Sequence, residues 1–500
     1  MDAIDKRPVL LVCPPSMFFS DDRQVPTLGH LYVAAALQQA GIPVDVLDLP
    51  LVDRDGNDEN PSYLRAVEDR IVSGPDYQAI GITALSPQMR EVNRIAQRAK
   101  EAKPEMLRIM GGGHPTLDHT CSDGCGAKSG TPDDPFDKVV IGDGEEAIFA
   151  ALDRSIAERY IHADKVKAKI AVPSATERPL LDDLDPYIPA RELTDINAFT
   201  MEIENRTGVK IPATTIMTQR GCPFGCVFCG GRDTAAYRVR RTRSPERVAE
   251  ELAEIRDKYG IRGIVAYDDE VNLPPWPIFF ALMDRLAQED FVLRGFIKAE
   301  LFTDEVAEAM VRAGFVEVAT GVESGSEQIL KNINKRTTPE INSQAAAIAE
   351  RHGMRFKAFL SVGHPGETKE TLRETRDWAL QEMAMRSGSS FFASVSLISP
   401  YPGTPIFDRP ESLGHFGFAL TYPQKEIDYT ENRAFQRADK ETYECLVRTD
   451  RLWTGSTYEV KPDGLSPDQL VDGRLELEEA IHNAQHGVVL GQYDKSMGQQ

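Results

Sequence analysis

Short apolar runs alternate with longer amphipathic stretches over the first 150 residues of the chain. The runs have the length and composition of buried strands and cover residues 9–13, 43–47, 79–83, 107–110 and 138–141. Apolar positions at helical spacing fill the intervals at residues 28–40, 63–72 and 89–102, and begin again at Glu145. Strands separated by helices are typical of parallel βαβ units. We therefore predict an α/β domain over residues 1–150, built on an open, doubly wound parallel sheet of five strands.

The same alternation returns from residue 213 onward. Apolar runs cover residues 214–218, 263–267, 293–298, 315–320, 356–362 and 394–398, and most are followed by a helical pattern. One of these helices is expected over residues 246–259, directly after Ser244 and Pro245, because Pro is favoured at the first helical position. Six strand-to-loop units predict a partial, TIM-like (β/α)6 barrel over residues 211–406. In such barrels the chemistry lies on loops at the carboxyl ends of the strands.

Two further segments have weaker patterns. Prolines and acidic residues punctuate residues 151–210 and exclude long helices, so we expect a linker that runs along the surface between two domains. Residues 407–500 carry helical patterns over 443–453 and 469–485. We expect a small α-rich capping region there, with Tyr422, Trp453 and Tyr458 either lining a substrate pocket or packed in a core.

Composition narrows the functional classes. With 500 residues, of which 41% are hydrophobic and 27% charged, the chain has the make-up of a soluble globular protein with several domains. The formal net charge of −21 argues against a nucleic-acid partner. The first residues form neither a signal peptide nor a membrane span, so no membrane partner is expected. Seven cysteines, three of them in one motif, favour a reducing, cytoplasmic compartment.

That motif is Cys222-x3-Cys226-x2-Cys229, in a turn rich in glycine and proline. Three thiolates can hold three irons of a [4Fe–4S] cube and leave the fourth iron free to bind another molecule. Zinc normally takes four protein ligands, and no further Cys or His lies within thirty residues of the motif. A disulfide is disfavoured in a reducing compartment, and a Cys-x-x-Cys redox pair would not need Cys222. The motif therefore predicts a metal site for an iron–sulfur cluster with an open iron.

This spacing, with Phe228 just before the last cysteine, resembles the signature of the radical S-adenosylmethionine (SAM) family. The resemblance implies that the open iron chelates SAM, and that one electron from the cluster cleaves SAM to methionine and a 5′-deoxyadenosyl radical. It implies an external electron donor, which would be a flavodoxin, a ferredoxin or a dedicated reductase. The residues that the resemblance assigns to SAM are Phe228, Gly230, Gly231, Asp268, Asp269, Glu270, Glu323, Ser324 and Ser361.

Strand-end residues of the barrel also give candidates for the substrate, which we assign to Glu300, His364 and Tyr401. Helix capping or first-turn charge is the competing interpretation for Asp268, Glu300 and Glu323, but their strand-end positions favour a site. His364 stands where the family's Gly-Leu-Pro-Gly-Glu loop has an apolar residue. It either acts as an acid or base or holds its loop together. The basic stretch 237–243 either meets anionic groups of a substrate or forms a solvated face.

Glycine-rich loops follow the strands of the first sheet. Glycine lets a backbone approach a ligand closely, although it also simply allows tight turns. Ahead of a radical SAM motif, these loops resemble the cobalamin-binding domain at the front of many radical SAM enzymes, over residues 8–150. The Asp-x-His-x-x-Gly signature that supplies a cobalt ligand is absent, as it is in many radical SAM members. The residues assigned to cobalamin by resemblance are Pro15, Leu28, Gly29, Thr83, Ser86, Gly112, Gly113, His114, Gly142, Asp143, Gly144 and Glu145.

Residues 116–136 interrupt the first domain between its fourth and fifth predicted strands. They contain His119, Cys121 and Cys125, which suggests a metal site, but Ser, Gly, Asp and Pro throughout the segment indicate a loop. A metal there would need a further ligand, such as His114, His30, Cys13 or Cys445. We favour a surface insertion without a metal.

Together these features predict a radical SAM enzyme that methylates an unactivated carbon of a small, secondary-metabolite substrate. As the resemblance implies, the deoxyadenosyl radical abstracts a hydrogen and the substrate radical takes a methyl group from methylcobalamin. The alternative keeps the radical step without cobalamin, as a dehydratase, epimerase or rearrangement enzyme acting on a sugar or aminocyclitol. A non-catalytic iron–sulfur regulator is a third alternative, which the ordered series of barrel loops disfavours.

Overall fold

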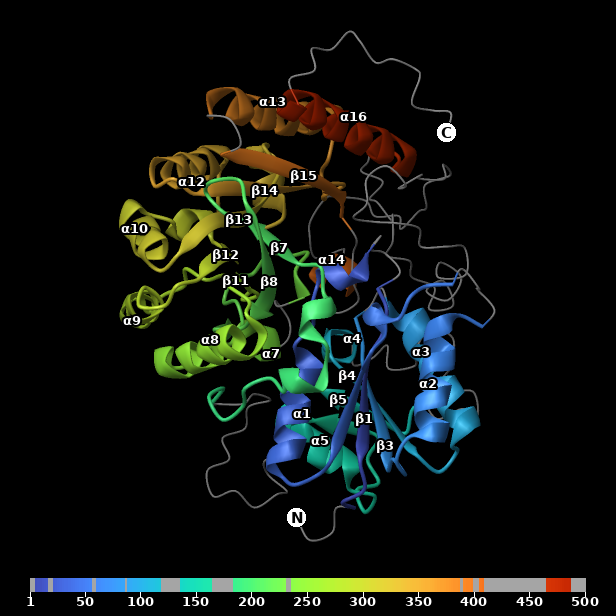
Figure 1. The fold of residues 1–500 in the computed structure, drawn as a ribbon. Coiled ribbons are helices and arrows are strands. Elements are labelled where there is room, and N and C mark those ends of the chain that lie inside the picture. The colour runs from blue at the N-terminus through green and yellow to red at the C-terminus, as the bar shows by residue number, and fades with distance from the viewer. Residues whose placement is uncertain are drawn as a thin grey trace.

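The fold is that of a computed structural model of the chain, shown in Figure 1. The structure describes residues 5–16, 21–55, 60–85, 88–117, 135–163, 183–230, 235–386, 390–398, 404–408 and 465–486. Two parallel sheets dominate it, one in the N-terminal part and one in the remainder of the chain. The predicted helix pattern at residues 443–453, together with Tyr422, Trp453 and Tyr458, lies outside the described residues.

The N-terminal sheet has six parallel strands in the order β2-β1-β3-β4-β5-β6. Its strands are β1 (Val9–Cys13), β2 (Val44–Asp48), β3 (Ala79–Thr83), β4 (Leu107–Gly111), β5 (Lys138–Ile141) and β6 (Tyr160–His162). One face packs on α1 (Gly29–Gln39) and α5 (Gly144–Leu152), and the other on α2 (Ser62–Ser73) and α3 (Met89–Ala102). Short helices are η1 (Asp22–Gln24), η2 (Leu49–Leu51) and α4 (Gly113–Leu117). The predicted doubly wound sheet is confirmed.

The count of five strands was wrong, because β6 adds a sixth at the edge of the sheet, inside the stretch 151–210. It is three residues long and only Ile161 of the three is buried. A strand this short at an edge has no apolar run to mark it in the sequence.

The second sheet has seven strands in the order β15-β14-β13-β12-β11-β8-β7, parallel except for β7 at one edge. They are β7 (Glu202–Glu204), β8 (Lys210–Ile216), β11 (Gly263–Ala266), β12 (Val292–Phe296), β13 (Phe315–Glu323), β14 (Arg355–Val362) and β15 (Phe391–Leu397). The six parallel strands confirm the predicted partial barrel. A separate antiparallel pair, β9 (Gln219–Arg220) and β10 (Arg241–Thr242), frames the cysteine loop.

Helices cover the outer face of this second sheet (Figure 1). The short helices α7 (Ala235–Arg238), η7 (Ala299–Leu301), α11 (Glu327–Asn332) and α14 (Pro405–Asp408) lie elsewhere in this part of the chain. The helices of the outer layer are α8 (Pro245–Tyr259), α9 (Trp276–Leu286), α10 (Asp304–Arg312), α12 (Pro339–Arg351), α13 (Lys369–Met385) and α16 (Pro467–His486). The last of these confirms the helix expected over 469–485 and packs against α13 and β15. Among the described helices, none combines the length and apolar character that crossing a membrane requires.

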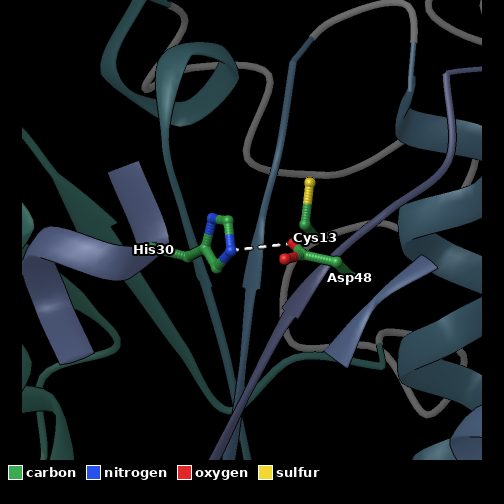
Figure 2. Close-up of side chains that lie close together, drawn as sticks. All are labelled: Cys13, His30 and Asp48. Carbon is green, nitrogen blue, oxygen red and sulfur yellow. Dashed lines mark ion pairs between the residues drawn. The ribbon is translucent and has the colours of Figure 1, made fainter. Parts of the chain in front are cut away.

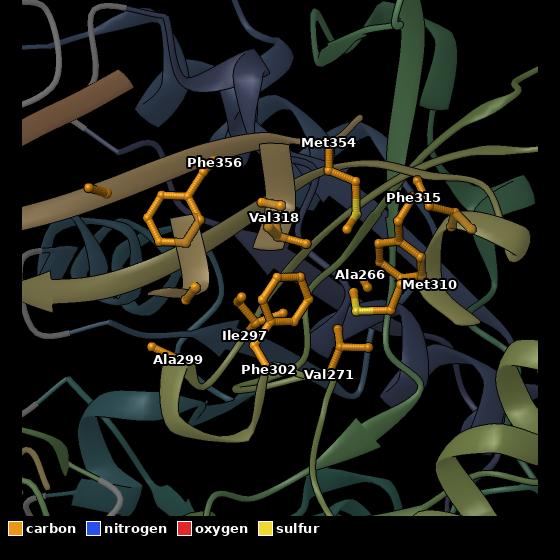
Figure 3. Close-up of a cluster of buried hydrophobic side chains, with 14 of the residues drawn as sticks. Ala266, Val271, Ile297, Ala299, Phe302, Met310, Phe315, Val318, Met354 and Phe356 are labelled. Atoms are coloured by element: carbon orange, nitrogen blue, oxygen red, sulfur yellow. The ribbon is translucent and has the colours of Figure 1, made fainter. Parts of the chain in front are cut away.

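The main apolar core lies between the second sheet and these helices. Figure 3 shows Phe315 and Val318 of β13 meeting Met310 of α10 and Phe356 of β14. Their side chains are almost fully buried. Close packing of this kind fixes the strands, and therefore fixes the loops that leave their carboxyl ends.

The described part of the linker, residues 183–209, is not a purely surface segment. It forms η4 (Arg191–Leu193) and η5 (Ile196–Ala198) before β7. The amide of Ala190 donates to the carbonyl of Leu31 in α1, at 3.1 Å. Arg191 is 2% exposed and donates to the carbonyl of Thr215 in β8, at 2.8 Å. The expectation of a surface linker was wrong here, because polar residues in this segment find buried partners in both domains.

Candidate functional site

A cavity of about 410 Å³ lies between the first sheet and the residues around the cysteine loop. Its N-terminal wall comes from α1 and from the loops that follow β1, β3, β4 and β5. The opposite wall comes from residues around the cysteine loop and the end of β11, including Gln219, Arg220, Gly221, Tyr237 and Asp269. The cavity therefore occupies the carboxyl ends of the first sheet's strands, where open α/β sheets bind their ligands.

At two positions of the cavity wall the chain has room only for glycine, because a side chain would collide with neighbouring residues. Gly112 has a φ of +99°, and a Cβ there would lie 2.8 Å from Oγ1 of Thr83. A Cβ on Gly144 would lie 2.9 Å from a methyl carbon of Val33. The volume lies in the range typical of pockets for organic ligands, about 300–1,000 Å³. The size of the cavity and its glycine-rich wall thus fit a bulky organic cofactor held mainly by backbone contacts.

Most residues assigned to cobalamin lie on this cavity. The lining includes Gly29, Thr83, Gly112, Gly113, Gly142, Asp143, Gly144 and Glu145. Leu28, His114 and Pro15 are buried, but none of the three belongs to the lining. Ser86 lies outside the described residues.

Arg220 connects the cavity to the cysteine loop. Its guanidinium donates to Oδ1 of Asp143 at 2.8 Å and to Oε1 of Glu145 at 2.5 Å, both at the start of α5. It also lies 4.9 Å from the centre of the Tyr32 ring, close enough for a cation–π contact. Burial lowers the pKa of Arg220, but the two carboxylates raise it by more, so the side chain stays charged. This paired arginine holds the two domains together next to the cysteines.

Two arginines of the basic stretch 237–243 neither face solvent nor form an open anion site. Arg241 pairs with Asp143, and Arg243 pairs with Glu251. Both guanidinium groups are buried. These arginines have carboxylate partners within the chain, so both interpretations of this segment were wrong for Arg241 and Arg243.

The cysteine loop runs from Cys222 to Cys229 between β9 and α7. Cys226 is buried, Cys222 is half-buried and Cys229 is exposed. The amide of Cys222 donates to the carbonyl of Tyr237 at 2.8 Å, and that of Val227 donates to the carbonyl of Ile333 at 3.0 Å. The loop is therefore fixed at two points by backbone hydrogen bonds to other parts of the barrel.

Burial raises the pKa of the Cys222 thiol to about 12. It also raises the pKa of Cys226, and Lys335 and Lys298 partly offset that effect. The ammonium of Lys298 lies 4.8 Å from the Phe224 ring centre and that of Lys335 lies 5.8 Å from the Phe228 ring centre. Two lysines beside the loop favour negative charge there, as a thiolate-bound cluster carries. Sequence reasoning assigned no role to either lysine.

Gly221 is required for the path of this loop. Its φ is +91°, and a Cβ there would lie 2.3 Å from the carbonyl oxygen of Val239. We expect Gly221→Ala to lower iron retention after cluster reconstitution by at least about half, since backbone must move next to Cys222. Gly260→Ala is the matched control, because Gly260 also has positive φ (+71°) but a Cβ there would meet no atom within 4 Å. Equal iron in both variants would contradict this account.

The three acidic residues after β11 divide into two kinds. Asp268 accepts from the amides of Thr218 and Gln219 at 2.6 and 3.1 Å, and Asp269 accepts from the amide of Gly221 at 3.0 Å. These two carboxylates hold the strand that leads into the cysteines. Glu270 is different, because its Oε2 is buried and has no hydrogen-bond partner within the described residues. Burial raises the pKa of Asp268 to about 6 and that of Glu270 to about 7.

Glu323 ends β13 in an unusual conformation, with a φ of +63°. Its carboxylate accepts from Nζ of Lys335 at 2.9 Å and from Oγ of Ser361 at 2.8 Å. Non-glycine residues at positive φ persist where the surroundings fix them, often at functional sites. The neighbouring Ser324 instead binds Thr375 of α13 through its hydroxyl, at 2.8 Å.

His364 is fully buried beside the loop, with its ring centre 5.3 Å from that of Phe228. Burial lowers the pKa of His364 to about 4, so the ring is neutral at physiological pH. Its Nε2 lies 2.6 Å from Oγ of Ser361. Since that hydroxyl donates to Glu323, it accepts from Nε2–H, which leaves Nδ1 as an acceptor without a partner among the described residues.

The remaining assigned residues lie around these groups. Glu300 pairs with Lys298 at 2.9 Å. A Cβ on Gly230 would lie 2.4 Å from a methyl carbon of Leu117 in α4, so the cysteine loop packs closely on the first domain. Gly231 and Tyr401 lie outside the described residues, as do His119, Cys121 and Cys125.

Comparison with known proteins gives two domain matches. The sequence profile of the radical SAM superfamily matches residues 216–379, and that of the B12 binding domain matches residues 20–152. The first region contains the cysteine loop and β11–β14, and the second contains the glycine-lined wall of the cavity. Both domain types expected from the sequence are confirmed.

Individual proteins resemble the chain over most of its length. An uncharacterized methyltransferase of Pyrococcus horikoshii is 28% identical over 80% of this chain and 82% of its own length. An anaerobic magnesium-protoporphyrin IX monomethyl ester cyclase of Rubrivivax gelatinosus is 26% identical over 76% of this chain and 65% of its own. The solved structure of the radical SAM methyltransferase TsrM of Kitasatospora setae, with tryptophan and a SAM analogue, has the same fold, with a TM-score of 0.67 at 17% identity. The match covers 98% of this chain and 92% of that one.

Proposed function

We propose that this chain, a member of the radical SAM superfamily with an N-terminal B12-binding domain, methylates an unactivated carbon of a small molecule in a cobalamin-dependent reaction. One observation carries the proposal: the glycine-lined cavity of the first domain is closed on its other side by Arg220 and Gly221, which lead directly into the cysteine loop. A ligand in the cavity would therefore lie next to the cluster site. The methyltransferase names of the Pyrococcus relative and of TsrM support the methyl step.

A bound cluster with SAM supplies a hydrogen-abstracting radical, and a bound cobalamin supplies a methyl carrier. The chain's own residues position these groups. Cys222, Cys226 and Cys229 would hold the cluster, while Asp268 and Asp269 fix the backbone before them. The ion pairs of Arg220 with Asp143 and Glu145 fix the position of the two domains relative to each other, so that the reacting molecules stay close together.

We propose that the carboxylate of Glu270 accepts a hydrogen bond from the amino group of SAM, because its buried Oε2 lacks a partner among the described residues. Glu270→Gln should weaken SAM binding by about 10- to 100-fold, because a charge-assisted hydrogen bond contributes about 1.5–3 kcal/mol. Iron content should not change, since the Glu270 carboxylate does not hold the cysteine loop. Equilibrium binding of SAM to the reconstituted protein measures the effect. Glu305→Gln, an exposed glutamate on α10, is the control, and unchanged affinity in Glu270→Gln would remove this assignment.

The products of SAM distinguish methyl transfer from other radical chemistry. Loss of the SAM methyl group leaves S-adenosylhomocysteine, whereas reductive cleavage leaves methionine and 5′-deoxyadenosine. We expect both sets of products from protein loaded with cobalamin and supplied with an electron donor, as measured by mass spectrometry. Formation of 5′-deoxyadenosine and methionine alone, with cobalamin bound, would contradict the methyl step.

A second candidate is a cobalamin-dependent radical reaction without methylation. The Rubrivivax cyclase is the observation in its favour, because it aligns with 76% of this chain and its name describes ring closure. The same product analysis separates the two candidates, since ring closure needs no transfer of the SAM methyl group.

A radical SAM enzyme needs electrons and protection of its cluster from oxidation. We infer an external flavodoxin, ferredoxin or dedicated reductase as donor, meeting the chain near the exposed Cys229. A cytoplasmic location follows from the same requirement, because reduced thiols and an oxygen-sensitive cluster persist in a reducing compartment.

A further inference from the structure

Cys13, His30 and Asp48 bring three different donor atoms together in the first domain (Figure 2). Cys13 ends β1 and Asp48 ends β2, and the two residues are register partners in the sheet. His30 lies in the first turn of α1. The sulfur, a ring nitrogen and a carboxylate oxygen lie within 4.8 Å of one another, and no other group of three such ligands within the described residues is that compact.

All three side chains are withdrawn from solvent, since their residues are between 1% and 7% exposed. Nε2 of His30 lies 2.9 Å from Oδ1 of Asp48. Hydroxyl groups surround the trio, because Thr194 donates to Oδ2 of Asp48 and Oγ1 of Thr27 lies 3.1 Å from Sγ of Cys13. Oriented polar neighbours of this kind are what metal ligands usually have.

The charge balance of the trio favours a cation. Within the trio the ion pair joins His30 and Asp48, at 2.9 Å, while Sγ of Cys13 lies 3.1 Å from Oγ1 of Thr27. A dication bound by thiolate, carboxylate and neutral imidazole would give a site with no net charge, which suits a buried position.

We propose that Cys13, His30 and Asp48 bind one zinc ion. A set of one sulfur, one nitrogen and one oxygen ligand suits this borderline metal. The ligand atoms of tetrahedral zinc lie about 3.3–3.6 Å apart, given bond lengths of about 2.0–2.3 Å, so side-chain adjustments of about 1 Å complete the site. The fourth coordination position of the zinc ion faces Thr27 and the cavity, because Cys13, Thr27 and His30 belong to the cavity lining. The zinc would join β1, β2 and α1 at the cavity edge, and this proposal does not depend on the methyl step.

Metal analysis of the reconstituted holoenzyme tests the site, since iron then occupies the three cysteines of the radical SAM loop. After equilibration in zinc-buffered solution, we expect about one zinc per chain. Cys13→Ser and His30→Gln should each reduce this to below about 0.2, with iron unchanged as evidence of an intact fold. The variant Cys121→Ser/Cys125→Ser is the matched control and should keep its zinc. No zinc in the unaltered enzyme, zinc retained without Cys13, or zinc lost from the control would each overturn the proposal.

X-ray absorption at the zinc edge gives a second readout in the same holoenzyme. The proposed site predicts one sulfur neighbour at about 2.3 Å and nitrogen or oxygen neighbours at about 2.0–2.2 Å. Zinc bound by Cys121 and Cys125 would show two sulfurs, and zinc bound by the radical SAM loop would show three. A spectrum with no sulfur, or with more than one, would overturn the assignment even if the zinc count were one.

Discussion

Each of the single variants Cys222→Ala, Cys226→Ala and Cys229→Ala is expected to abolish SAM cleavage. A [4Fe–4S] cube held by three thiolates has no protein ligand to spare, so a variant with two thiolates should fall from about four irons per chain to below about one. Lys335 and Lys298 do not compensate, because ammonium groups stabilise the charge of the cluster without binding iron.

The measurement is iron content together with 5′-deoxyadenosine formation after anaerobic reconstitution. Cys445→Ala is the control and should keep both, since Cys445 lies far from the motif in the sequence. Any one of the three variants that retained a full cluster and normal cleavage would show that the motif is not the complete ligand set.

The second large effect concerns stability at the junction between the linker and the barrel. Glu251 of α8 is 1% exposed and accepts from Arg191 at 2.6 Å and from Arg243. Burial raises the pKa of Glu251, but the two arginines lower it by more, and the net shift is downward. Glu251→Ala would leave two buried guanidinium groups without their carboxylate, which costs about 3–5 kcal/mol of unfolding free energy.

Denaturant unfolding at neutral pH measures this loss, with Glu250→Ala as the neighbouring control. Glu250 pairs with Arg247 on the surface, where an ion pair contributes about 0–1 kcal/mol. Because the pKa of Glu251 is depressed in the fold, its contribution is present above the unfolded pKa and disappears as the pH falls through the folded value. Equal effects of the two variants would contradict the buried triad.

The predictions from the sequence were correct where the signal lies in neighbouring positions of the chain. Except for the short edge strands β6 and β7, the strands of both sheets contain apolar runs, and the three cysteines carry their spacing in a single loop. Both predicted domain types are confirmed by the family profiles. The loops after β4 and β5 were identified because the glycines that line the cavity are adjacent in the chain.

The predictions were wrong or incomplete for residues whose role depends on partners far away in the chain. Arg241 and Asp143 are 98 positions apart, and nothing in the sequence near either one indicates that they form a pair. The roles of Asp268, Asp269 and Glu270 differ although they are consecutive, because the first two accept from different backbone amides while Oε2 of Glu270 has no partner among the described residues. Cys13, His30 and Asp48 come from three separate elements, so their proximity became visible only once the sheet order was known.

The most direct test of the central claim is the ratio of cobalt to iron in protein produced with cobalamin uptake and purified without oxygen. The proposed function predicts about one cobalt and about four irons per chain, with cobalt lost on washing when bulky side chains replace Gly112 and Gly144 in the cavity wall. Cobalt near zero, with a full cluster and active SAM cleavage, would contradict the cobalamin-dependent methylation proposed for this enzyme.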